Sequence, residues 1–234
     1  MKKTNNILYY LILSIISAIL LLILAFFSSF HINNNSIYDA LFFGGVFIIS
    51  CIFGISLAIR PGWFRRYSKH ENHGARKKQD QKITRKRKGH HPDCNQFQNH
   101  TVVIRNKTIC AGCLGLSMGS VISIFLMIIY IPNAGGLFST IFYFPLVLGL
   151  IIIGLVYVEI ILPTRYKIVH VISNFFLVIS FFLITIGIFE ITGNKIYGLI
   201  GILLSFLWLD TRIQLSNWHH NLICKNCSEP CKMY

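Results

Sequence analysis

The chain has 234 residues, of which 54% are hydrophobic and only 13% are charged, and its mean hydropathy is +0.60. A soluble domain carries about 25% charged residues, so this composition leaves too little polar surface for a soluble globule and indicates a membrane protein. The 22 Lys and Arg residues against 8 Asp and Glu residues give a formal net charge of +14, which suits anionic lipid or nucleic acid as a partner.

Long apolar blocks predict transmembrane helices. A hydrocarbon core about 30 Å thick needs roughly 20 helical residues to cross it, and helices satisfy every backbone polar group inside lipid. The blocks lack the strict alternation of a transmembrane β-barrel. The sequence therefore predicts an all-α polytopic membrane protein of about six helices, at residues 7–30, 37–59, 113–131, 137–162, 168–189 and 196–213.

The first block begins with Lys2 and Lys3, as a signal peptide would. Its apolar stretch is much longer than the core of about 7–15 residues found in cleaved signal peptides. We expect it to remain as the first helix, which forms a transmembrane hairpin over residues 1–59 with the second.

The distribution of basic residues predicts the orientation. If Lys2 and Lys3 are cytosolic, the loops at 31–36, 132–136 and 190–195 lie outside, and Lys195 is the one Lys or Arg residue among them. Such asymmetry is what the positive-inside rule describes. We expect a protein of the prokaryotic cell (plasma) membrane with both termini in the cytosol.

Residues 60–89 form a basic cytosolic linker that follows the second helix. Residues 60–88 contain twelve Lys and Arg residues against Glu71 and Asp80. Basic residues beside a membrane gain about 1 kcal/mol each from anionic headgroups. A nucleic-acid surface would interleave base-stacking aromatic residues throughout such a run, so the bilayer is the expected partner and nucleic acid is not.

The next segment, residues 90–113, contains the first Cys/His group. Residues 102–104 predict a short strand and residues 105–107 a turn. Helices at 114–215 follow, and the tail at 216–234 contains the second group. The metal-ligand candidates are His91, Cys94, His100, Cys110 and Cys113 in the first group, and His219, His220, Cys224, Cys227 and Cys231 in the second.

Clustered cysteines in the cytosol are typical of metal sites or redox catalysis, because disulfides are disfavoured there. Three thiolates and one imidazole in each group match a closed tetrahedral zinc site. We expect two zinc sites, while one shared site or a two-metal cluster joining insert and tail remains open. An iron–sulfur cluster in the tail is less expected, because a ferredoxin spacing is missing. The seventh cysteine, Cys51, is expected to fill space inside the second helix.

A redox interpretation also has a physical basis. Cys110 and Cys113 stand at the start of the third helix, where the helix dipole stabilises a thiolate. Membrane thiol oxidoreductases of the quinone-linked kind also place a CxxC pair at a helix end, but theirs faces the oxidising side and this one is predicted to face the cytosol.

The segment from His91 to Gly119, with the run Cys110-Ala-Gly-Cys113-Leu-Gly-Leu, resembles the DUF2085 family of small prokaryotic membrane proteins of unknown function. The resemblance covers about 30 residues of the chain. It implies a membrane location and a cysteine motif at the cytosolic boundary, and no activity. The long basic insert and the cysteine-rich tail depart from the family's form.

Ionisable residues gather near the cytosolic ends of the later helices, and three of them are acid–base candidates: Glu159, His170 and Asp210. One interpretation is that Glu159 and Asp210 form ion pairs with Arg165 and Arg212, and that these pairs fix helix packing. The other is a polar pocket that opens to the cytosol above the metal sites, because ionisable groups within spans are often functional. Gly115 and Gly119 form a GxxxG spacing suited to close helix contact.

Three functions remain in competition. The first is a non-enzymatic membrane protein whose zinc sites fold the insert and tail for interaction with a protein partner or for sensing. The second is a membrane enzyme acting at the cytosolic face, metal-dependent or thiol redox, although HExxH, GxSxG and P-loop motifs are missing. The third is a transporter, which would place polar residues at the membrane midplane. The sequence favours the first.

Overall fold

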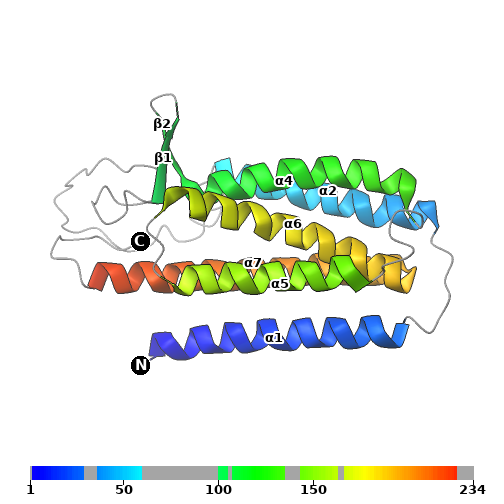
Figure 1. Ribbon diagram of the computed structural model, residues 1–234, viewed down its shortest axis with the longest axis horizontal. Coiled ribbons are helices and arrows are strands. Elements are labelled where there is room, and N and C mark those ends of the chain that lie inside the picture. The colour runs from blue at the N-terminus through cyan, green and yellow to red at the C-terminus, as the bar shows by residue number, and fades with distance from the viewer. Residues whose placement is uncertain are drawn as a thin grey trace, which may run out of the picture.

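The computed structural model describes residues 2–28, 36–59, 100–104, 107–134, 143–162 and 166–225. Within these ranges, six helices are long and apolar enough to cross a membrane, which confirms the all-α polytopic prediction. The helices run along one another and alternate in direction (Figure 1). Their bounds are α1 (Lys2–Ser28), α2 (Ile37–Ile59), α4 (Ala111–Tyr130), α5 (Tyr143–Ile161), α6 (Lys167–Thr192) and α7 (Lys195–Lys225).

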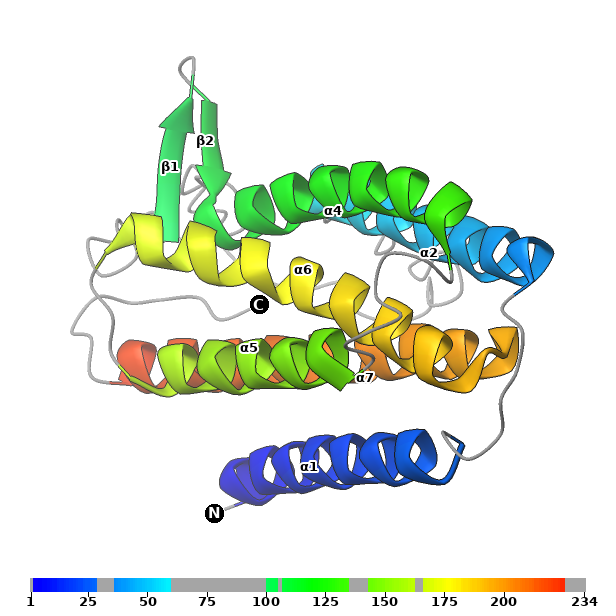
Figure 2. The same cartoon turned by 45° about the vertical axis from the view of Figure 1, so that its right-hand side comes forward.

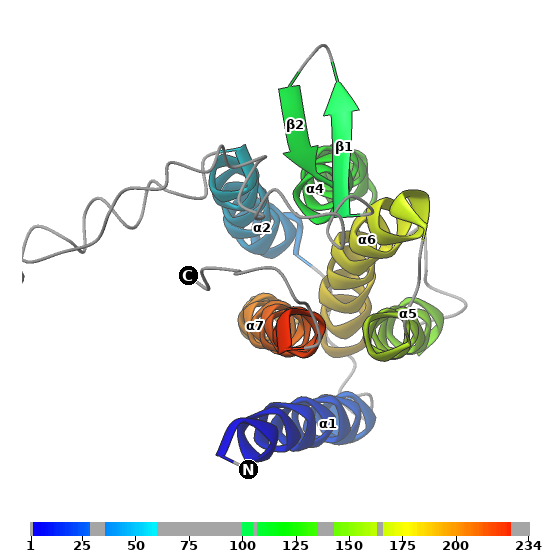
Figure 3. The same cartoon turned by 90° about the vertical axis from the view of Figure 1, so that its left-hand side faces the viewer.

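Helix α6 is the central element of the bundle. It lies among α4, α5 and α7, while α2 packs beside α4, and α1 lies on the side of α7 and α5 (Figure 3). Of the six spans it is the most buried, and its buried side chains include Leu177, Ile184 and Phe189. The predicted filler Cys51 is also buried within this core, as expected.

Small residues let α4 approach the backbone of α6. A Cβ atom on Gly115 would lie 2.2 Å from the carbonyl oxygen of Val171, and one on Gly119 would lie 2.7 Å from that of Phe175. Under such spacing only glycine fits, which confirms the predicted packing role of the GxxxG spacing. This contact fixes the start of α4 against the start of α6.

Polar contacts inside the bundle join α1 to the rest. The indole nitrogen of Trp208 donates a hydrogen bond to Ser17 Oγ at 3.0 Å. The Tyr157 hydroxyl donates to the backbone oxygen of Trp208 at 3.0 Å and lies 3.1 Å from Ser14 Oγ. Buried polar groups in a membrane need such partners, so these bonds fix α1 against α5 and α7.

Helix ends are where the structure differs most from the sequence prediction. The predicted outer loop at 190–195 is wrong for residues 190–192, because α6 continues to Thr192 and buries Glu190, which accepts a hydrogen bond from Tyr130. Gly193, with φ 60°, then ends the helix in the left-handed conformation that favours glycine. The start of α2 is joined to the start of α7 by an ion pair, with Asp39 Oδ1 and Lys195 Nζ 2.8 Å apart.

The predicted polar tail also begins as helix. Helix α7 was expected to end near residue 213, yet it continues to Lys225. The predicted strand is confirmed as β1 (Thr101–Ile104), which pairs antiparallel with β2 (Lys107–Cys110). This hairpin stands at the starts of α4 and α6 (Figure 2). We call this end of the bundle, where α1, α4 and α6 begin and α2, α5 and α7 end, the hairpin end; it is the end predicted to face the cytosol.

Candidate metal site at the hairpin end

A polar pocket of about 90 Å³ opens at the hairpin end, among the hairpin, α4, α6 and α7. It is lined mostly by groups that can bind metals, carry charge or donate hydrogen bonds. These polar lining residues are His100, Cys110, Cys113, His170, Arg212, Ser216, His219 and His220. Residues from both predicted Cys/His groups therefore border the same cavity.

The β-hairpin brings two of these residues together. Thr101 pairs with Cys110 across the two strands, so His100 and Cys110 lie at the same end of the hairpin. Cys110 is the N-cap of α4, and Cys113 follows in the first turn. Their thiols are hydrogen-bonded to each other. The turn from strand to helix thus presents two sulfur atoms to the pocket, side by side.

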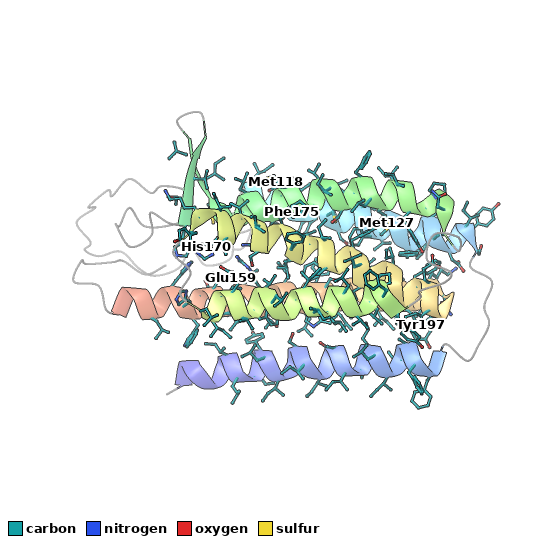
Figure 4. All side chains as sticks on the ribbon, viewed as in Figure 1. Met118, Met127, Glu159, His170, Phe175 and Tyr197 are labelled. Atoms are coloured by element: carbon teal, nitrogen blue, oxygen red, sulfur yellow. The ribbon has the colours of Figure 1, made fainter. Side chains whose placement is uncertain are left out.

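Helix α6 contributes His170, whose ring is held by Glu159 of α5. Its Nδ1 lies 3.0 Å from Glu159 Oε1, and the two side chains are only 12% and 13% exposed. The two residues face each other at the hairpin end in Figure 4. A carboxylate beside Nδ1 fixes the proton there and leaves a lone pair on Nε2. That Nε2 atom is buried and has no hydrogen-bond partner within the described part of the chain.

A cluster of imidazoles extends from His170 to α7. The His100 ring stacks on His170 with 4.6 Å between ring centroids, and the His220 ring meets His100 edge-on at 5.1 Å. His219 is close enough to His170 and Glu159 to interact with both electrostatically. Imidazole nitrogens are common ligands of zinc, copper, iron and nickel.

One face of α7 supplies the remaining polar groups. Arg212, Ser216, His219 and His220 follow the i, i+4, i+7, i+8 spacing of a single helical face. Arg212 interacts electrostatically with Cys110, Cys113 and Glu159. Its side chain reaches α4 where Gly112 stands, since a Cβ on that glycine would lie 3.1 Å from Arg212 Nη2. A side chain at position 112 would crowd the guanidinium.

Asn174 supports the same region from one turn further along α6. It is 1% exposed, and its Nδ2 donates to the carbonyl oxygen of His170 at 2.5 Å. The sequence placed Asn174 with His170 at the cytosolic boundary, without assigning it to the site, and it gave no indication of Ser216 as a site residue. The spacing of four residues from His170 to Asn174 and from Arg212 to Ser216 was the available signal.

The structure brings together most of the predicted residues that it describes, with one exception. Asp210 does not line the pocket, because it precedes Arg212 by two residues and so lies about 200° away around α7. Its Oδ1 accepts a hydrogen bond from Gln214 Nε2 at 3.3 Å. Among the described residues, Asp210 is therefore not paired with Arg212 as predicted, while the predicted pairing with Arg165 lies outside them. The predicted residues His91, Cys94, Arg165, Cys227 and Cys231, and the side chain of Cys224, lie outside the described part.

Within the described ranges, no three His, Cys, Asp or Glu side chains are already arranged around a single point as metal ligands. No family model, curated protein or solved structure matches the chain. The resemblance to the DUF2085 family therefore stays a prediction. The residues that line the pocket are the basis for assigning its chemistry.

Proposed function

We propose that this membrane protein binds a zinc ion in the pocket at the hairpin end, and that the ion fixes the insert and the end of α7 to the transmembrane bundle. Cys110 and Cys113 supply two thiolates, and imidazoles from the cluster complete the tetrahedral set. The observation that carries the proposal is that the strand-to-helix turn and α7, which are separated in the chain by three transmembrane helices, border one cavity with six sulfur- or imidazole-bearing side chains.

The charges around the pocket support this choice of ligand. Zinc carries two positive charges, and two thiolates balance them. Arg212 and Glu159, which interact electrostatically, balance each other. A buried charge is costly unless it is paired. The charges of the zinc ion, the two thiolates, the guanidinium and the carboxylate sum to zero, so this group of charges can be buried at the edge of a membrane.

A shared site replaces the two separate sites as the favoured arrangement. Ligands on a hairpin, on the first turn of α4 and on α7 would join elements that are far apart in the chain. Because a structural zinc site contributes to folding free energy, its role here is to hold a cytosolic platform for interaction or sensing.

Zinc content of the full-length protein, purified in detergent under reducing conditions, tests the proposal. We expect about one zinc ion per chain, as one tetrahedral site requires. Cys110→Ser/Cys113→Ser should remove it, and His219→Ala/His220→Ala should lower its retention during dialysis. Cys51→Ala is the matched control, because Cys51 is a buried thiol within α2 and does not line the pocket.

Two results would change the conclusion. A wild-type protein free of metal, or one whose zinc survives Cys110→Ser/Cys113→Ser, would overturn the proposal. A second zinc ion that Cys224→Ser/Cys227→Ser removes while leaving the first would restore the two-site prediction.

A membrane enzyme acting at this face is the second candidate. The observation that favours it is the Glu159–His170 pair, since a histidine held by a carboxylate is a common general base. An enzyme would need an open coordination position or a thiol pair that cycles between oxidation states. Cobalt-substituted protein whose visible spectrum shifts on adding small anions such as azide or cyanide would favour this candidate, because a closed site excludes them.

A further inference from the structure

We infer that His170 is itself a ligand of the metal and that Glu159 is the residue that positions it. This inference rests on the proposed function and deepens it, because neither residue belongs to the two Cys/His groups of the sequence. It makes α6, the central helix of the bundle, a direct partner of the ion.

The two nitrogen atoms of the His170 ring have different surroundings. Nδ1 faces the Glu159 carboxylate at 3.0 Å, while Nε2 is buried and has no hydrogen-bond partner among the residues that the structure describes. A buried polar atom without a partner is costly, and such atoms in a folded protein call for an explanation. Metal-ligating histidines have this pattern: one nitrogen is held by a carboxylate, and the other is directed to the metal.

Other potential metal ligands surround the His170 ring. His170 lines the same cavity as Cys110 and Cys113, and its ring lies flat against His100 at 4.6 Å between centroids. His219 acts electrostatically on the same ring. Stacking of neutral imidazoles stabilises the protein little. If an ion were bound among them, side-chain rotation would direct their nitrogen atoms to that ion. Such rotation is needed, because the described side chains do not yet surround one point.

Well-packed helices hold His170 and its neighbours in place. The start of α6 is held against α4 by the close approach of Gly115 to Val171 and Asn174. Glu159 comes from a third helix, α5. Ligands on well-packed helices hold a metal more precisely than ligands on loops. Cys113, His170 and one histidine of α7 would therefore hold three transmembrane helices around the ion, in contrast to a zinc finger folded within the insert.

Zinc and cobalt affinities of full-length variants, measured by competition with a chromophoric chelator, test this inference. Glu159→Gln should weaken zinc binding by about 10- to 100-fold, the usual effect of removing a carboxylate partner of a ligating histidine. His170→Ala should weaken it further and should change the visible d–d bands of the cobalt-loaded protein. Glu190→Gln is the matched control, because it neutralises a buried carboxylate of α6 that hydrogen-bonds Tyr130, a residue that does not line the pocket.

The outcomes separate this inference from the proposal beneath it. If the wild-type protein contains and binds no metal, both the proposed zinc site and the role of His170 are overturned. The role of His170 alone would be overturned if the wild-type protein binds zinc and both His170→Ala and the milder His170→Gln match its zinc affinity and its cobalt spectrum. The proposed zinc site would then stand. A Glu159→Gln effect no larger than that of Glu190→Gln would overturn the positioning role of Glu159. If His170→Ala fails to fold, His170→Gln decides, since glutamine keeps a donor toward Glu159.

Discussion

Replacing Gly115 with alanine should separate α4 from α6 and destabilise the bundle. The new Cβ atom would lie 2.2 Å from the carbonyl oxygen of Val171 and 2.9 Å from Cβ of Asn174. An ordinary carbon–oxygen contact is about 3.3 Å, so the helices must part by roughly 1 Å. Overpacking of this kind costs about 1–3 kcal/mol, and the better helix propensity of alanine returns up to about 1 kcal/mol of that.

The measurement is unfolding in mixed micelles, with increasing dodecyl sulfate in a mild detergent, followed by circular dichroism. Gly154→Ala is the control, because a Cβ on Gly154 would meet nothing within 4 Å. Gly115→Ala should unfold at clearly lower dodecyl sulfate than the wild type, while Gly154→Ala should match or exceed it. Equal stability of the two variants would refute the close contact of α4 with α6, and with it the alignment of Cys113 with His170.

Three further predictions concern the rest of the bundle. Tyr130→Phe should destabilise the protein by about 1–3 kcal/mol in the same titration, because it removes the hydrogen bond to the buried Glu190 carboxylate; an unchanged midpoint would contradict this. Asp39→Asn should cost no more than about 1 kcal/mol, and less at high salt, since the pair with Lys195 is partly exposed. Epitope tags at both termini should resist protease added to intact cells and be cleaved after lysis; cleavage in intact cells would reverse the predicted topology.

Much of the fold was predictable from the sequence because each membrane crossing requires its own apolar block. All six predicted spans correspond to helices, and the GxxxG spacing correctly located the contact of α4 with α6. The end of α7 could not be predicted in this way. Hydropathy falls after residue 213, yet Ser216, His219 and His220 continue the helix because their side chains line a pocket made by other elements.

The candidate site was predictable in composition but not in grouping. Neighbourhood in the chain suggested one site for Cys110 and Cys113 and another for His219 and His220, whereas all four border one cavity. The sequence did place the ionisable residues near one membrane boundary. It could not say which face of each helix turns inward, so Asp210 was included as readily as His170. Rotation about a helix axis is set by packing, and packing here depends on glycines of α4 meeting carbonyl groups of α6.

The most direct test of a shared site is the coordination shell of the bound zinc ion, measured by X-ray absorption on the full-length protein. We expect a mixed shell of two sulfur atoms at about 2.3 Å and two imidazole nitrogens at about 2.0 Å. His170→Ala should then reduce the imidazole contribution. A shell of three or four sulfur atoms that His170→Ala leaves unchanged would contradict the account, because the ion would then be held by cysteines within one segment of the chain and not by the ends of the transmembrane helices.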